Sequence, residues 1–97
     1  MIRKYELVYI MDSSLSDENR NAILEKIGNI IKRDAELIDQ QNLGEKGLAY
    51  PIKKKQKGIY IKDVFKGMQS TVKEIERTLK ITEGILRYLT VRVEQTS

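Results

Sequence analysis

The stretch LAYPIKKKQKGIYIKDVFK, residues 48–66, lies near the middle of the 97-residue chain and decides its fold. Its first five residues favour extended structure, although Pro51 lacks an N–H group and therefore belongs at the edge or the end of a strand. Lys53–Lys57 predicts a loop, and Gly58 restarts a strand that runs over Ile59–Lys66. The stretch therefore predicts two neighbouring strands joined by a lysine-rich hairpin.

A helical pattern lies on each side of this hairpin. Before it, Ser16 is the expected N-cap of a helix that ends near residue 32 or 33, and Gly28 inside that helix is expected to allow close packing on the sheet. After the hairpin, Gly67, Gln69 and Ser70 are expected to form the turn and cap of a second helix that ends near residue 80. The predicted core stripes are Ile23, Ile27, Ile30 and Ile31 in the first helix, and Val72, Ile75 and Leu79 in the second.

The outermost segments and the segment before the hairpin are expected to be strands. Residues 3–11 (RKYELVYIM) become apolar on both faces, which is typical of a strand in the middle of a sheet. Residues 35–42 predict a strand that bends or bulges at residues 43–47, and residues 85–94 predict the final strand. The order is β-α-β-β-α-β. We therefore predict one α+β domain over residues 1–97 with a ferredoxin-like fold, in which both helices cover one face of a four-stranded antiparallel sheet.

The other face of the predicted sheet has no helix to cover it. Apolar and aromatic residues are nevertheless expected there, namely Val8, Ile10, Tyr60 and Val64. An uncovered apolar face indicates a surface for a protein partner. On the inward face of the third strand, the same alternation places Asp63, and the pattern offers no reason for an acid at that position.

The composition excludes most catalytic mechanisms. The chain has no cysteine and no histidine, which removes disulfides, the usual zinc sites, cysteine nucleophiles and histidine bases. No pair of carboxylates has the context needed for acid–base catalysis. We therefore expect no enzymatic activity, no metal and no cofactor. The absence of a secretory signal and of a long apolar run favours a cytoplasmic protein with no membrane association.

Positive charge is concentrated around the hairpin. Residues 12–39 carry a net charge of −3, whereas residues 40–66 carry +5. Lys53, Lys54, Lys55 and Lys57 can neutralise phosphates, although lysine contacts position a nucleic acid rather than read its sequence. The alternative is that these lysines only keep a solvated turn soluble. The third strand lacks the stacking aromatics of a standard RNA-recognition motif.

Two other functions remain open from these patterns. A regulatory module could form a dimer through the uncovered sheet face and ignore RNA. An acyl-phosphate hydrolase is a further alternative, but the segment MDSSLSD at residues 11–17 is acidic and lacks glycine, so it would repel phosphate.

Three separated segments resemble one known family. The segment GEKGLAYPIK at residues 44–53 closely resembles the signature of the bacterial small-subunit ribosomal protein S6 family, in which LAYPI follows a basic residue and a glycine. The segment RKYE at residues 3–6 resembles the opening strand of that family, and ILRY at residues 85–88 resembles its last strand. The resemblance covers about residues 2–94. Asp63 departs from it, because the family usually has an apolar or aromatic residue there.

The resemblance implies a ferredoxin-like fold and a structural role in the bacterial small ribosomal subunit. It implies binding to the central domain of 16S ribosomal RNA as a heterodimer with ribosomal protein S18, and we expect a monomer in isolation, with no small-molecule substrate. RNA contact is implied at the matching positions Arg3, Tyr5, Tyr50, Lys53, Lys54 and Arg87, and charge alone adds Lys55, Lys57 and Arg92. The candidates for contact with the partner protein are Val8, Ile10, Tyr60 and Val64.

Overall fold

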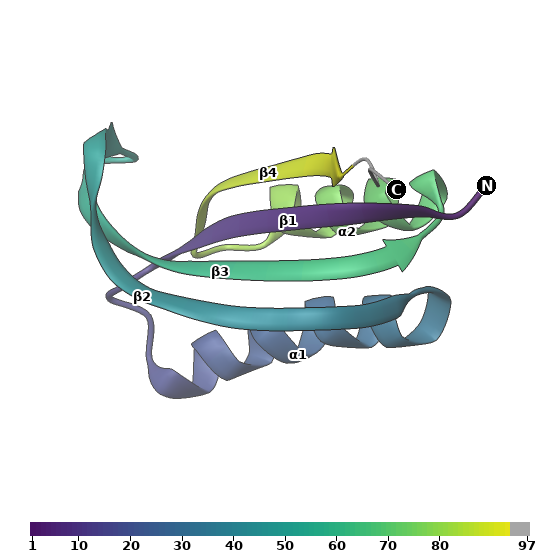
Figure 1. Ribbon diagram of the computed structural model, residues 1–97. Helices are drawn as coiled ribbons and strands as arrows, with labels where there is room; N and C mark the ends of the chain where they lie inside the picture. Colours follow the sequence, from purple (N-terminus) through teal and green to yellow (C-terminus); the bar gives the residue numbers. More distant parts are fainter. Residues whose placement is uncertain (94–97) are drawn as a thin grey trace.

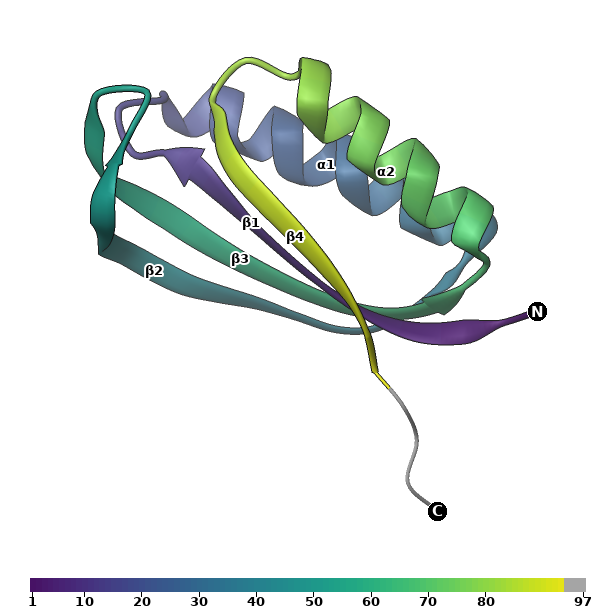
Figure 2. The ribbon, with the colours of Figure 1, turned by 90° about the horizontal axis from the view of Figure 1, so that it is seen from above.

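A four-stranded antiparallel sheet carries both helices on one face (Figures 1 and 2). The structure is a computed structural model that describes residues 1–93. Its elements are β1 (Arg3–Asp12), α1 (Asp17–Asp34), β2 (Glu36–Ile52), β3 (Lys55–Gly67), α2 (Gln69–Ile81) and β4 (Ile85–Val93). The strand order β2-β3-β1-β4 places β1 in the interior of the sheet, as predicted. The ferredoxin-like fold is confirmed, and residue 94 of the predicted final strand lies outside the described residues.

The core fills the space between the inward face of the sheet and the two helices. The inward residues of β1 are buried, and Leu7 and Tyr9 expose 0% of their surface. Ile27 and Ile75 pack against them from α1 and α2. The buried residues of the two helices include every residue of the predicted stripes. The helical spacing of apolar residues therefore identified which face of each helix is buried.

The two helices begin in different ways. Ser16 caps α1, and its Oγ accepts a hydrogen bond from the Asn19 N–H at 3.1 Å, as expected. The N-cap of α2 is Met68, whose side chain makes no capping hydrogen bond, so the predicted cap at residues 69 and 70 is wrong. At Gly67, just before this helix, a Cβ would lie 2.8 Å from the Ala35 Cβ, so the chain passes close to the C-cap of α1 there. Within residues 1–93, neither helix is long and apolar enough to cross a membrane.

Gly28 does not allow close packing on the sheet, contrary to expectation. A Cβ built at this position would meet no heavy atom within 4 Å outside the neighbouring helix backbone. The space beside Gly28 is therefore open, and the residue lowers the helix propensity of α1 without a steric reason.

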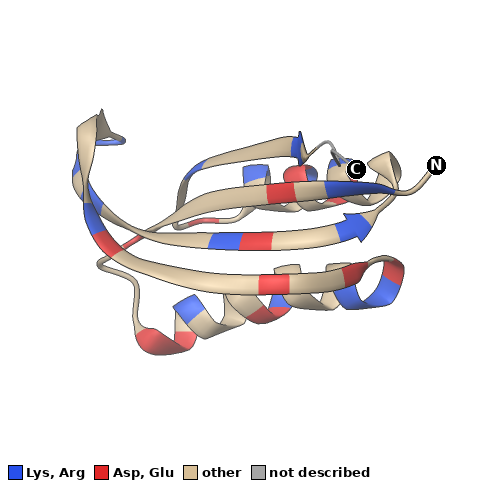
Figure 3. Cartoon of the chain, viewed as in Figure 1, with Lys and Arg blue, Asp and Glu red and all other residues tan. Residues whose placement is uncertain are grey.

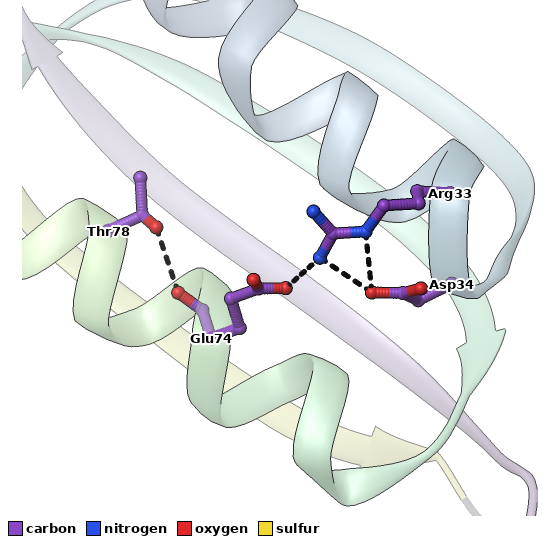
Figure 4. A network of polar contacts seen from close by, with 4 residues as sticks. All are labelled: Arg33, Asp34, Glu74 and Thr78. Atoms are coloured by element: carbon purple, nitrogen blue, oxygen red, sulfur yellow. Dashed lines mark hydrogen bonds and ion pairs between the residues drawn. The ribbon is translucent and has the colours of Figure 1, made fainter.

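A charged network joins the C-terminal end of α1 to α2 (Figure 4). Arg33 donates two hydrogen bonds to Asp34, at 2.9 and 2.7 Å, and a third to Glu74. Hydrogen bonds to the Arg33 guanidinium lower the pKa of the Asp34 carboxyl, and bonds to both acids raise the pKa of Arg33. These groups lie at the surface, where ion pairs contribute little to stability, so the network mainly orients the two helices.

Candidate nucleic-acid interface

The lysine-rich hairpin turns more tightly than the sequence predicted. Only Lys53 and Lys54 lie outside the strands, and Ile52 and Lys55 face each other across the turn. Both turn residues have positive φ, 50° and 65°, as the two central residues of a type I′ turn require. The predicted loop at residues 53–57 is therefore too long, because strand pairing continues to Lys55.

The hairpin bends over the ends of β1 and β4 (Figures 1 and 2). The Lys53 Nζ donates to the carbonyl oxygen of Ile85 at 3.1 Å, and an Arg87 guanidinium N–H donates to the Tyr50 hydroxyl at 2.5 Å. The structure thus brings together the hairpin residues that were predicted to bind RNA and Arg87, which is distant in sequence.

Charge is distributed unevenly along the fold (Figure 3). Lysines lie along the bent hairpin, and acidic residues mark the start of α1. The hairpin residues Lys54 and Lys57 are exposed. Farther from the turn, on β2, the Lys46 Nζ lies 5.8 Å from the centre of the Tyr60 ring on β3, within the range of a cation–π interaction. An extended polyanion would therefore meet several ammonium groups along one ridge.

A second group of predicted RNA contacts lies at the opposite end of the sheet. Arg3 is near the start of β1, and Arg92 faces Tyr5 across the β1–β4 pair. Nine residues of β1 separate this end from the hairpin, a distance of about 30 Å. Both arginines line an open hollow of about 690 Å³ beside the start of α2. The predicted RNA-binding residues therefore form two separate basic regions.

Tyr5 is not available for stacking on a base. Its side chain is 7% exposed and packs in the core, with its ring centre 5.7 Å from that of Phe65. The expectation that Tyr5 contacts RNA is therefore corrected. The alternation of strand β1 already placed Tyr5 on the inward face, whereas Tyr50 is 57% exposed on the hairpin.

The uncovered sheet face differs in part from the prediction. Val8, Tyr60 and Val64 lie on it and are half-buried. Ile10 is only 7% exposed, because its side chain lies close against Gly58, where an added Cβ would lie 2.3 Å from the Ile10 Cγ2. Ile10 is therefore removed from the candidate partner surface.

Two exposed apolar residues of β4 complete this surface. Leu89 faces Val8 across the β1–β4 pair and is 61% exposed, and Val91 is 49% exposed. The alternation of side chains along β4 is a signal that identifies both residues, whereas the predicted surface contained residues of the first and third strands only. We call Val8, Tyr60, Val64, Leu89 and Val91 the outer-face patch.

Asp63 is fully buried on the inward face, as the alternation predicted. It exposes 0% of its surface, and neither carboxylate oxygen has a hydrogen-bond partner at normal distance among the described residues. Burial raises the pKa of Asp63 to about 6, and the Gln40 side chain opposes this rise in part. Burial, followed by the field of Asp63, also raises the pKa of Tyr9, whose hydroxyl is likewise buried without a partner.

Comparisons with known proteins agree over nearly the whole chain. A family model described as ribosomal protein S6 matches residues 4–92. The small ribosomal subunit protein bS6 of Clostridioides difficile is 40% identical over 90 residues, which cover 93% of this chain and 98% of that protein. The bS6 protein of Caldanaerobacter subterraneus subsp. tengcongensis is 36% identical over 94 residues, with 96% and 99% covered. The crystal structure of 30S ribosomal protein S6 from Thermotoga maritima has a TM-score of 0.88 at 26% identity and covers 96% of this chain and 89% of that chain.

This chain, with its ferredoxin-like sheet, one bare sheet face and a basic hairpin, therefore belongs to a class of structural, non-enzymatic proteins of the small ribosomal subunit. The family match leaves only a few residues at each end of the chain uncovered. The chain belongs to the ribosomal protein S6 family.

Proposed function

We propose that this protein binds the central domain of 16S ribosomal RNA together with ribosomal protein S18, in the cytoplasm as part of the ribosome. Membership of the S6 family supports this function. The observation that carries the RNA-binding part is the basic hairpin, which presents exposed lysines next to the exposed Tyr50 and to Arg87. This arrangement offers charge for phosphates and an aromatic ring for an unpaired base.

The RNA contacts fall into two regions. The first contains Tyr50, Lys53, Lys54, Lys55, Lys57 and Arg87 at the hairpin. The second contains Arg3 and Arg92, about 30 Å away along the sheet. A single contact cannot bridge that distance, so the RNA would have to extend along the protein or approach it with two segments.

The outer-face patch is the proposed contact for S18. Its apolar residues come from three neighbouring strands, and Leu89 and Val91 lie open to solvent. Exposed apolar side chains grouped on a rigid sheet favour a protein partner over RNA, because burial of apolar area drives such association.

Removing the charge of the hairpin tests the RNA-binding proposal. Alanine at positions 53, 54, 55 and 57 should weaken binding to a central-domain fragment of 16S RNA and reduce the dependence of the affinity on salt. Filter binding at several salt concentrations, with and without S18, measures both quantities. An unchanged salt dependence would show that the hairpin does not contact phosphate.

A charged residue on the outer face tests the partner proposal. Leu89→Asp should abolish association with S18, whereas Ile81→Asp is a matched control, because Ile81 is 77% exposed at the end of α2. Sedimentation of each variant with S18 measures association. A tight homodimer with no affinity for the RNA would instead favour the interaction module described above.

A further inference from the structure

The four lysines of the hairpin have different surroundings. Lys53 donates to the Ile85 carbonyl at 3.1 Å, and Lys55 pairs with Asp12, with its Nζ 3.3 Å from the Asp12 Oδ2. Within residues 1–93, the ammonium groups of Lys54 and Lys57 have no hydrogen-bond or ion-pair partner. All four lysines are exposed, but two have partners within the protein and two have none among the described residues.

The hydrogen bonds of Asp12 orient its carboxylate toward Lys55. Its Oδ1 accepts hydrogen bonds from the Ser14 N–H at 2.9 Å and from the Ser14 Oγ at 2.8 Å, which leaves Oδ2 for Lys55. The backbone hydrogen bond from Ser14, together with Lys55, lowers the pKa of Asp12, so the carboxylate is charged at neutral pH. The Asp12 side chain is 15% exposed, and the pair is therefore partly shielded from solvent.

The backbone conformation of the turn is unusual for lysine. Asparagine and glycine are the residues that favour a type I′ turn, whereas lysine is unfavourable in the left-handed region. Here both central positions are lysine, with φ of 50° and 65°. An unfavourable backbone conformation at two successive lysines points to a role for their side chains.

We propose that these lysines divide into two pairs with different roles in RNA binding. Lys53 and Lys55 are positioning residues that fasten the hairpin to β4 and to the end of β1. Lys54 and Lys57 are the residues that contact phosphate. This inference rests on the proposed RNA-binding function and refines it, since the family resemblance groups Lys53 with Lys54, whereas the contacts in the structure group Lys53 with Lys55.

Single substitutions by methionine test this division, because methionine keeps an unbranched apolar side chain and removes the charge. Lys54→Met and Lys57→Met should each make the negative slope of log affinity against log salt shallower by about 0.7–0.9. This corresponds to a loss of affinity of about 5–8-fold at 0.1 M salt, if the affinities are equal at 1 M. Lys53→Met and Lys55→Met should leave the slope unchanged. They should instead increase amide hydrogen exchange at residues 48–57 in the free protein.

Asp12→Asn is the matched control for Lys55. It keeps an oxygen that can accept from Ser14, breaks the ion pair with Lys55 and makes the protein more positive by one charge. Positioning predicts that Asp12→Asn and Lys55→Met both increase exchange in the hairpin and both weaken binding to the central-domain RNA fragment. Direct phosphate contact by Lys55 predicts opposite effects on affinity, and that result would overturn the assignment.

The remaining outcomes separate this inference from the function on which it rests. Equal decreases in the salt slope for all four methionine variants would overturn the division while leaving RNA binding intact. Wild-type protein that fails to bind the RNA, alone and with S18, would overturn the proposed function.

Unchanged hydrogen exchange in Lys53→Met, Lys55→Met and Asp12→Asn would by itself overturn the positioning role. Thermal melts of each variant confirm that the fold is intact.

Discussion

Replacing Asp63 with asparagine probes a carboxylate that has no exposed surface. Asp63 lies on β3 among core residues, and its two oxygens have no hydrogen-bond partner at normal distance within residues 1–93. Asparagine has nearly the same shape and no charge. The substitution therefore removes the cost of burying an ion and leaves the packing of the core almost unchanged.

The expected effect depends on pH, and its sign follows from the raised pKa. Burial raises the pKa of Asp63 from 3.8 to about 6 in the folded protein. The folded state therefore favours the neutral acid, and this contribution to stability is complete below pH 3.8 and is lost as the pH rises through 6. A rise of about two pH units, at 1.36 kcal/mol each, corresponds to about 3 kcal/mol. Asp63→Asn should thus stabilise the protein by about 2–3 kcal/mol at pH 8 relative to its effect at pH 4, where the carboxyl of the unfolded chain is already partly ionised.

Urea denaturation of both proteins between pH 4 and pH 8 measures this effect. The difference between the two unfolding free energies cancels the titration of the other groups, so it should change steadily between about pH 4 and pH 6 and be nearly constant above about pH 7. Asp39→Asn is a matched control, because it makes the same substitution at an exposed position on the neighbouring strand. A constant difference for Asp63→Asn would refute the argument, since it would mean that Asp63 has the same pKa in both states.

Three further substitutions have expected outcomes that thermal or urea unfolding can check. Gly28→Ala should stabilise the protein by about 0.5–1 kcal/mol, because its Cβ enters open space on α1; destabilisation would reveal a contact not seen in this structure. Ser16→Ala should cost about 1 kcal/mol through loss of the cap on the Asn19 N–H, and Ser16→Asp should largely retain it. Lys54→Gly should stabilise the turn by about 0.5–1 kcal/mol, because glycine accepts the φ of 65° at little cost. Lys54→Gly should at the same time weaken RNA binding. A loss of stability together with the loss of RNA affinity would contradict the idea that the lysine at this position is unfavourable for the turn.

Local sequence patterns predicted most of the fold. Apolar spacing predicted the buried faces of both helices, and Ser16 marked the start of α1, because these features depend on residues within a few turns of one another. The start of α2 was mispredicted, because Met68 occupies the N-cap position without a side-chain hydrogen bond and therefore carries no capping signal. The space beside Gly28 depends on which neighbours surround it.

The candidate site was harder to predict for the same physical reason. Composition identified the basic hairpin, and the family resemblance identified the segments around it. No pattern in residues 48–57 could show that Lys53 meets the Ile85 carbonyl or that Lys55 meets Asp12, because both contacts arise only when the hairpin bends over the sheet. A count of lysines therefore does not show which ammonium groups have partners within the protein.

The hairpin and the outer-face patch are too close to act independently. Leu89 faces Val8, and the next outer-face pair along the same strands joins Arg87 to Ile10. Two residues along a strand span about 7 Å, so a protein bound over Leu89 would lie beside Arg87, which holds the hairpin through Tyr50. We therefore expect RNA and the partner protein each to change the affinity of this protein for the other. Thermodynamic linkage requires that the factor by which RNA changes the affinity for the partner equals the factor by which the partner changes the affinity for RNA. Tyr50→Phe, which removes the acceptor for Arg87, should bring both factors closer to one in paired binding titrations.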